Sequence, residues 1–211
     1  MDFYDIEQNT DQWYDLRVGK LTASCFGKVM ANANKGIFGE PAKKYAVEIA
    51  LGQITGSRPP AGYQNEHMQR GHEQEPIARD LYEKAFSVEV KNGGFFTDGF
   101  IGCSPDGLVD DKGVIEIKSV IATTHFATIQ RGTYDPSYKW QLIGNMYYTH
   151  SNYIDFVSYC SEFPTGGQLY TYRLHKRDYL TELVLMENRF NDFKVLVSET
   201  KDTILNSTIF N

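Results

Sequence analysis

Residues 103–119 read CSPDGLVDDKGVIEIKS, and the strand pattern of the chain is clearest here. Its last part, residues 114–119 (VIEIKS), is rich in β-forming residues and follows the turn-forming residues 110–113 (DDKG). This order predicts a strand that begins directly after a tight turn. Because side chains along a strand alternate between its two faces, Glu116 and Lys118 are expected to project from the same face.

The other side chains of this strand separate an apolar face from a charged one. Val114 shares the face of Glu116, whereas Ile115 and Ile117 point the other way, where they can pack on helices. Asp106 lies ten residues before Glu116, and a hairpin across the turn can bring the two carboxylates together. Charges placed among apolar strand residues are costly unless they are neutralised, so we expect the pair to have a chemical role.

Two carboxylates beside a lysine are suited to metal-assisted cleavage of a phosphodiester bond. Carboxylate oxygens are the ligands that Mg²⁺ or Mn²⁺ prefers, and two such ions roughly 3.5–4 Å apart stabilise both the attacking and the leaving oxygen. The lysine can orient the attacking water or help to deprotonate it. Glu-x-Lys alone is a weak pattern, since it recurs at residues 89–91 and 199–201, where a solvated surface is the simpler interpretation.

The composition is that of one globular domain, and we expect residues 1–211 to form it. Apolar residues make up 41% of the chain and charged residues 23%, which argues against a disordered or collagen-like chain. The net charge of −6 argues against a protein that coats nucleic acid through bulk positive charge. An enzyme acting on nucleic acid is not excluded, because bound divalent metal offsets carboxylates locally.

The number of cysteines and the lengths of the apolar segments indicate the cellular compartment of the protein. Cys25, Cys103 and Cys160 are odd in number and lack metal-ligand spacing, so neither a disulfide framework nor a zinc site is expected. No run approaches the ~18 apolar residues that suggest a membrane helix, and residues 1–13 are acidic and unlike a secretory signal. We therefore predict no membrane association and a cytoplasmic protein, in the host cytoplasm if the chain is viral.

Hydrophobic periodicity predicts a mixed α/β (α+β) fold in which helices flank one central mixed sheet. Helices are predicted over residues 40–51, 77–86, 136–149 and 177 to about 204. Strands are predicted over residues 95–103 and 107–109, as neighbours of 114–119, and over 153–160 and 168–174. Loops rich in Gly, Pro or Asn are predicted at residues 31–39, 52–62 and 163–167.

Polar side chains outside the central hairpin are candidates for the same site. Glu73 and Glu75 precede the helix predicted at residue 77, and either can supply a metal ligand; the alternative is favourable negative charge at a helix N-terminus. Pro76 restricts the residue before it, so the choice between the two glutamates stays open. Gln141 opens the helix after the sheet and can offer an amide, although a lone helical glutamine is more often simply exposed.

Residues 13–24 (WYDLRVGKLTAS) contain a candidate anion site. Arg17 is suited to bidentate phosphate contact, and Ser24 can join it at a helix N-terminus. The alternative is a surface arginine and a serine that caps a helix.

Four sequence blocks occur in one order and together point to a known family. They are WxxLRxGxxTAS (13–24), GxxxExxAxxLYE (71–83), CSPDGL…ExK (103–118) and WQ…MYYT (140–149). In this combination the chain resembles the lambda exonuclease / YqaJ-like viral recombinase family of the PD-(D/E)xK nuclease superfamily. The resemblance covers about residues 10–150.

The resemblance implies a restriction-endonuclease-like core and a role for each matching residue. Asp106 and Glu116 would ligate the catalytic Mg²⁺, with the backbone carbonyl of Ile117 helping. Lys118 would act on the nucleophilic water, and Glu75 would be the helix-borne carboxylate for the second metal. Mn²⁺ is a possible substitute for Mg²⁺.

The resemblance also implies a substrate and partners. Gln141 would sit beside the site, and Arg17 and Ser24 would bind the terminal 5′-phosphate, with Ser104 nearby. The enzyme would degrade one strand of linear duplex DNA in the 5′→3′ direction and leave a 3′ single strand for an annealing protein in phage-type recombination. The expected assembly is a homotrimer.

Two other functions stay open, whereas a histidine metal site and a thiol nucleophile are not expected. The chain could be a structure-specific or restriction-like endonuclease, or an inactive scaffold that binds DNA ends. His67 and His72 lack the spacing of helical metal pairs, so we treat them as non-ligands. Cys103 lacks a matched histidine base, so a thiol nucleophile is not expected.

Overall fold

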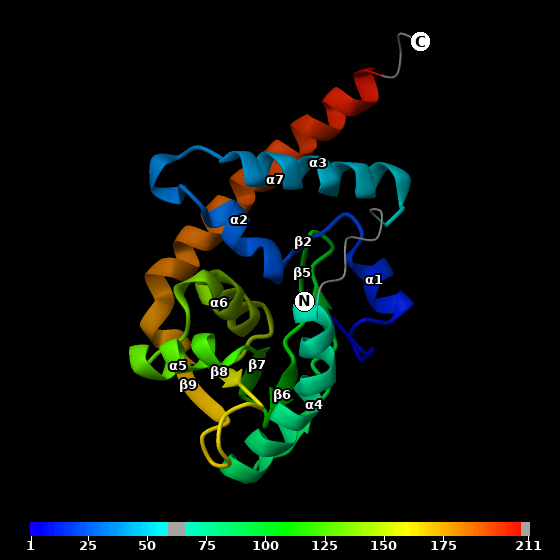
Figure 1. The fold of residues 1–211 in the computed structure, drawn as a ribbon. Coiled ribbons are helices and arrows are strands. Elements are labelled where there is room, and N and C mark those ends of the chain that lie inside the picture. The colour runs from blue at the N-terminus through cyan, green and yellow to red at the C-terminus, as the bar shows by residue number, and fades with distance from the viewer. Residues whose placement is uncertain (59–65, 208–211) are drawn as a thin grey trace.

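The fold comes from a computed structural model that describes residues 1–58 and 66–207 (Figure 1). The α-helices are α1 (Asp11–Arg17), α2 (Phe26–Met30), α3 (Glu40–Thr55), α4 (Glu66–Phe86), α5 (Ala122–Arg131), α6 (Lys139–Tyr148) and α7 (Leu180–Ser207). Short 3-10 helices are η1 (Ala23–Cys25), η2 (Ala33–Lys35), η3 (Pro136–Tyr138) and η4 (Lys176–Tyr179). The strands are β1 (Asp2–Tyr4), β2 (Leu21–Thr22), β3 (Val90–Lys91), β4 (Phe95–Thr97), β5 (Ile101–Cys103), β6 (Gly107–Val109), β7 (Gly113–Ser119), β8 (Tyr153–Tyr159) and β9 (Leu169–His175).

A five-stranded sheet in the order β3-β6-β7-β8-β9 carries the motif strand β7 at its centre. β6 and β7 form the predicted hairpin, with Gly107 opposite Ile115. β7 and β8 run parallel, and the other neighbours in this sheet are antiparallel. The connection between β7 and β8 contains α5 and α6, as a parallel crossover requires.

The two faces of β7 are covered by different helices, as the alternation of its side chains predicts. Ile115 and Ile117 pack with Ala78 and Tyr82 of α4 on one face. Val114 packs with α6 on the other face, which is also the face of Glu116. Helices α4 and α6 therefore flank this part of the sheet, each against one face of β7 (Figure 1).

The prediction of a single sheet is wrong, because residues 95–103 do not form one strand beside β7. They form β4 and β5, which belong to a second sheet in the order β1-β4-β5-β2. A turn at Asp98–Gly99 separates them: Gly99 has a φ of 97°, and Asp98 Oδ1 accepts from the backbone N–H of Phe100 at 2.9 Å and of Ile101 at 2.7 Å. The actual neighbours of β7 are β6 and β8.

The largest apolar cluster lies where α2, α3 and α7 meet. It contains Phe26 and Phe190, whose ring centroids are 4.5 Å apart, and Phe193, which stacks on Tyr45. Figure 1 shows α3 crossing α7, and the C-terminal end of α7 extends beyond the rest of the molecule. None of the described helices is long and apolar enough to cross a membrane.

Helix boundaries differ from the predictions where polar residues hide the helical period. The helix predicted over residues 77–86 begins already at Glu66, and Pro76 lies inside it. The helix predicted over 40–51 continues to Thr55 and ends at Gly56, whose φ is 64°. The predicted loop 52–62 thus begins later, and its residues 59–62 lie outside the described residues. Helices α1, α2 and α5 and strands β1, β2 and β3 were not predicted.

Candidate functional site

The turn before β6 holds Asp106 against the middle of β7. The backbone N–H of Asp106 donates to the carbonyl of Ile115 at 3.0 Å, and Asp106 Oδ2 accepts from the backbone N–H of Ile117 at 2.6 Å. These two hydrogen bonds fix both the peptide and the carboxylate of Asp106 beside the strand that carries Glu116 and Lys118. The hairpin therefore brings the three motif residues together, as the sequence predicts.

Glu116 is buried, and every hydrogen bond to its carboxylate comes from a side chain that faces it. Its Oε1 accepts from Lys118 Nζ at 2.6 Å and from Gln141 Nε2 at 2.5 Å. Its Oε2 accepts from Asn145 Nδ2 at 2.8 Å. Gln141 therefore faces the site, and Asn145 is a site residue that the sequence reasoning missed. Its position four residues after Gln141, on the same face of α6, was the available signal.

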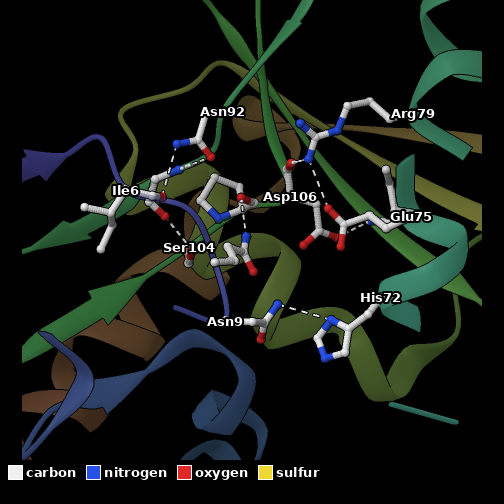
Figure 2. A network of polar contacts seen from close by, with 12 residues as sticks. Ile6, Asn9, His72, Glu75, Arg79, Asn92, Ser104 and Asp106 are labelled. Carbon is white, nitrogen blue, oxygen red and sulfur yellow. Dashed lines mark hydrogen bonds and ion pairs between the residues drawn. The ribbon is translucent and has the colours of Figure 1, made fainter. Parts of the chain in front are cut away.

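Helix α4 presents Glu75, rather than Glu73, to Asp106. Glu75 and Asp106 line the same cavity, and their carboxylates point toward each other in Figure 2. Glu73 is exposed and accepts a hydrogen bond from Gln69 at 2.9 Å. Glu75 Oε1 accepts from Arg79 Nη2 at 3.0 Å. Glu75 is therefore the glutamate that faces Asp106, because the helix continues through Pro76 and aims position 75 at the sheet, while its role as a metal ligand stays a prediction.

Burial raises the pKa of each carboxyl group in this cluster, and repulsion between neighbouring carboxylates adds to the shift at Glu75 and Glu116. Burial, with repulsion from Asp106, raises the pKa of Glu75 to about 7 and that of Glu116 to about 8. Burial also raises the pKa of Asp106. Burial opposes the charge on Lys118, but Glu116 and Asp106 outweigh it and raise the pKa of the ammonium group above its usual value. The cluster therefore attracts positive charge.

The donor set suits a hydrated divalent cation better than a closed protein cage. Within residues 1–58 and 66–207, no three His, Cys, Asp or Glu side chains converge to hold a metal ion on their own. Mg²⁺ needs less than that, because it typically takes one or two carboxylates and completes its shell with water and substrate phosphate. Asp106 and Glu116 provide such carboxylates, and Ile117 lines the same cavity with Asp106. The residues present fit this kind of ion.

Glu75 and Asp106 line one part of a cavity of about 820 Å³, and Arg17 lines another part. The guanidinium of Arg17 lies 4.1 Å from the centre of the Trp13 ring, and its Nη2 is 3.5 Å from both Thr22 Oγ1 and Ser24 Oγ. Burial lowers the pKa of Arg17, and no carboxylate among the described residues pairs with it. Arg17 is thus a cation available to an anion in the cavity, with Ser24 exposed beside it.

The hydroxyl of Ser104 is held by protein partners. It accepts from Trp13 Nε1 at 3.0 Å and donates to the carbonyl of Gly94 at 2.5 Å, so its one proton is directed at the protein. Ser104 also does not line the cavity that contains Arg17. Its structural effect is to hold the indole on which Arg17 lies.

The segment between β1 and α1 crosses the site. Gln8 Nε2 donates to the carbonyl of Pro105 at 2.9 Å, directly before Asp106. Asn9 Nδ2 lies 3.2 Å from His72 Nδ1 on α4, and Figure 2 shows the two side chains facing each other. His72 therefore has a protein partner, while the side chain of His67 lies outside the described residues.

The cysteine next to the motif is inert. Cys103 is fully buried, and burial raises the pKa of its thiol well above the usual range. This agrees with the expectation that the thiol is not a nucleophile.

Most of the chain matches the model of a known protein family. Residues 12–152 match the model of the YqaJ-like viral recombinase domain. The chain belongs to this family. No curated protein is detectably similar to the chain.

Two solved proteins of similar fold are exonucleases. The alkaline exonuclease LHK-Exo from Laribacter hongkongensis is 31% identical, with a TM-score of 0.82, 94% of this chain covered and 98% of that one. Its complex with dAMP matches with a TM-score of 0.83 over the same shares of both chains, again at 31% identity. A phage related exonuclease from Haemophilus somnus 129PT is 16% identical, with a TM-score of 0.63 over 90% of this chain and 96% of that one, and shows the shared fold.

Proposed function

We propose that this YqaJ-like chain is a Mg²⁺-dependent exonuclease that degrades one strand of linear duplex DNA in the 5′→3′ direction and leaves 3′ single-stranded tails. The observation that carries the proposal is a single cavity lined by Asp106, Glu75 and Lys118 together with Arg17. A nuclease that works from DNA ends needs both halves of this arrangement. The carboxylates serve hydrolysis, and the arginine recognises the terminal phosphate.

The likeness to exonucleases supports the same proposal. At 31% identity over 94% of this chain, LHK-Exo is a relative in sequence as well as in fold. It was crystallised with dAMP, which is the class of product that stepwise hydrolysis of DNA releases. A product of this class would fit the cavity of about 820 Å³ that the carboxylates line.

Asp106 and Glu116 would hold the first Mg²⁺ with the carbonyl of Ile117, and Glu75 would hold a second ion. Bound Mg²⁺ supplies charge neutralisation on the phosphate and a lower pKa for the attacking water. Gln141 keeps Glu116 oriented through its hydrogen bond of 2.5 Å. Glu116 and Asp106 raise the pKa of Lys118. Lys118 would orient the attacking water or help to deprotonate it, and its charge would stabilise the phosphate.

Arg17 would bind the terminal 5′-phosphate and thereby set the polarity of digestion. Its guanidinium is held over Trp13 by a contact of 4.1 Å, so the charge is fixed before DNA arrives. Ser24 lies 3.5 Å from the same guanidinium and can add a hydroxyl contact. A phosphate bound there would be retained while the adjacent phosphodiester meets the carboxylates.

Labelled linear DNA tests activity, polarity and metal dependence together. Duplex with a label at one 5′ or one 3′ end is incubated with Mg²⁺, with Mn²⁺ and with EDTA. With either metal, we expect a label at the 5′ end to be released as a nucleotide before a label at the 3′ end. We expect no release with EDTA. Cleavage of closed circular duplex would instead support the endonuclease alternative, and DNA binding without cleavage in both metals would support an inactive scaffold.

Two variants separate the two halves of the site. Lys118→Ala should abolish cleavage and leave DNA binding intact, and near-normal turnover would remove Lys118 from the mechanism. Arg17→Ala should reduce the preference for 5′-phosphorylated over unphosphorylated ends, and an unchanged ratio would contradict the phosphate assignment. Arg177→Ala is a matched control, since the Arg177 side chain is 79% exposed and pairs only with the neighbouring Asp178 in the described structure.

We also propose, from the family, a homotrimer and a single-strand annealing protein as partner. Light scattering of the purified chain tests the trimer, with a monomer as the contradicting result. Co-purification with a co-expressed single-strand annealing protein of a phage tests the partner, and complete separation at low salt would contradict it.

A further inference from the structure

Arg79 joins the two carboxylate-bearing segments of the site. It follows Glu75 by one helical turn on α4, and its Nη2 donates to Glu75 Oε1 at 3.0 Å. The same nitrogen donates to the backbone carbonyl of Asp106 at 2.5 Å (Figure 2). One guanidinium therefore fixes the side chain of Glu75 and the peptide of Asp106 relative to each other.

This contact opposes the repulsion between the two carboxylates. The side chain of Glu75 is 27% exposed, so it has water to turn toward. Two like charges close together in a partly buried site disfavour each other. Without the guanidinium, rotation of Glu75 away from Asp106 would relieve this repulsion and improve its hydration. Arg79 makes the inward conformation favourable before any metal binds.

Arg79 reaches Glu75 from the side away from the main cavity. It lines a smaller cavity of about 320 Å³ together with Glu75 and Asp106. It does not line the larger cavity that contains Lys118 and Arg17. Arg79 therefore acts on Glu75 without facing the cavity proposed for DNA. Among the described residues, the hydrogen bond to the Glu75 carboxylate is made at Oε1, which leaves the lone pairs of Oε2 for a cation.

We propose that Arg79 is a positioning residue that holds Glu75 toward Asp106 and so completes the second cation site. The inference rests on the proposed function, since it names how one ligand of that site is held. Arg79 also donates to the backbone carbonyl of Asp106, and this hydrogen bond does not involve the Glu75 carboxylate. Arg79 can therefore stay in place when Glu75 binds a metal ion.

Mn²⁺ binding to the intact chain without DNA tests this role independently of cleavage. We expect wild type to bind two Mn²⁺ ions, and Arg79→Ala to weaken the weaker site at least tenfold. Arg79→Lys should give an intermediate loss, because an ammonium keeps the charge without the planar fork. If Arg79→Ala does not fold, Arg79→Lys is used in its place. An unchanged Mn²⁺ affinity of the weaker site in that variant would overturn the inference.

The control is Lys84→Ala. Lys84 pairs with Asp80 at the same i,i+4 spacing on α4, but both side chains are exposed, at 71% and 56%. This variant should leave Mn²⁺ binding unchanged.

The Mg²⁺ concentration for half-maximal cleavage should rise at least tenfold in Arg79→Ala, with a much smaller change in the rate at saturating Mg²⁺.

A double variant shows whether Arg79 acts through Glu75. In a Glu75→Ala background, Arg79→Ala should cause no further loss of Mn²⁺ binding. A further loss of similar size, or unchanged binding in the single Arg79 variant, would overturn the inference and leave the nuclease proposal standing. Wild type that binds two Mn²⁺ ions but never cleaves DNA would refute only the nuclease proposal. Wild type that binds no Mn²⁺ would refute both.

Discussion

Replacement of Gly93 by alanine should disable the site without changing any of its side chains. Gly93 is buried against the turn that carries Asp106. A Cβ on residue 93 would lie 1.7 Å from the carbonyl oxygen of Pro105 and 3.2 Å from the backbone nitrogen of Gly107. The atom it would strike first belongs to the backbone, so no rotamer change of a flexible side chain can make room.

The size of the effect follows from this distance. Ordinary contact of a Cβ begins at 3.4 Å, so a contact at 1.7 Å requires a relative movement of about 1.7 Å. Asp106 follows Pro105 directly and must share in this movement. A misplacement on the order of 1 Å at a reacting centre can cost about 100-fold in rate. Overpacking of this kind costs roughly 1–3 kcal/mol of stability, or about 2–4 °C in Tm for each kcal/mol in a chain of this size.

The assay compares cleavage of end-labelled duplex with thermal unfolding for Gly93→Ala and a control. We expect cleavage to fall about 100-fold while the variant remains folded with a lowered Tm. Gly27→Ala is the control, because a Cβ on that helical residue meets nothing within 4 Å. Wild-type cleavage together with an unchanged Tm in Gly93→Ala would refute the proposal that the Asp106 turn is rigidly placed by this packing.

Three further predictions concern the support of the site and its pH dependence. Tyr82→Phe removes the hydroxyl that donates to buried Asp155 at 2.5 Å, while Arg173 still donates to Asp155 at 2.8 and 2.7 Å. Urea unfolding should show that the free energy of unfolding falls by roughly 1.5–3 kcal/mol, and a fall below about 0.5 kcal/mol would contradict this. Asn145→Leu removes the only described donor to Glu116 Oε2, at 2.8 Å; calorimetry should show weaker Mg²⁺ binding, and unchanged affinity would make Asn145 merely structural. Protons compete with Mg²⁺ for Glu75 and Glu116, whose pKa values are raised to about 7 and about 8; cleavage at limiting Mg²⁺ should therefore rise as pH increases through this range, and more Mg²⁺ should shift the midpoint to lower pH. If the midpoint of the pH dependence does not change with the Mg²⁺ concentration, protonation of Glu75 and Glu116 is not its cause.

The parts of the site that follow from local geometry were predictable. Strand alternation placed Glu116 and Lys118 on one face of β7, and the hairpin returned Asp106 to the same strand. Both relations span few residues, so neither depends on how distant segments pack. Ile115 and Ile117 likewise went to the apolar face.

The choice between Glu73 and Glu75 needed the whole helix. The upstream half of α4 is polar and contains Pro76, so the apolar period that marks a helix starts only at residue 77. Once the helix is known to begin earlier, Glu75, Arg79 and Tyr82 follow at spacings of four and three on one face. The partners of this face lie in distant strands, which no local pattern reveals.

The second sheet was missed because its strands are short and pair over long distances. β2 has two residues and pairs with β5, about eighty residues later in the chain. β1 pairs with β4 across a similar separation. Such strands carry too few residues for an alternating pattern. The partner of Ser104 was missed for a related reason, because Trp13 lies on an unpredicted helix 91 positions away in sequence.

Anomalous diffraction from crystals soaked in Mn²⁺ would locate the cations of the proposed site. We predict Mn²⁺ between the carboxylates of Asp106 and Glu116, close to the carbonyl of Ile117, and a second ion near Glu75. Crystals that diffract well but show no Mn²⁺ at these carboxylates, with Lys118 still paired to Glu116 as at 2.6 Å here, would contradict it.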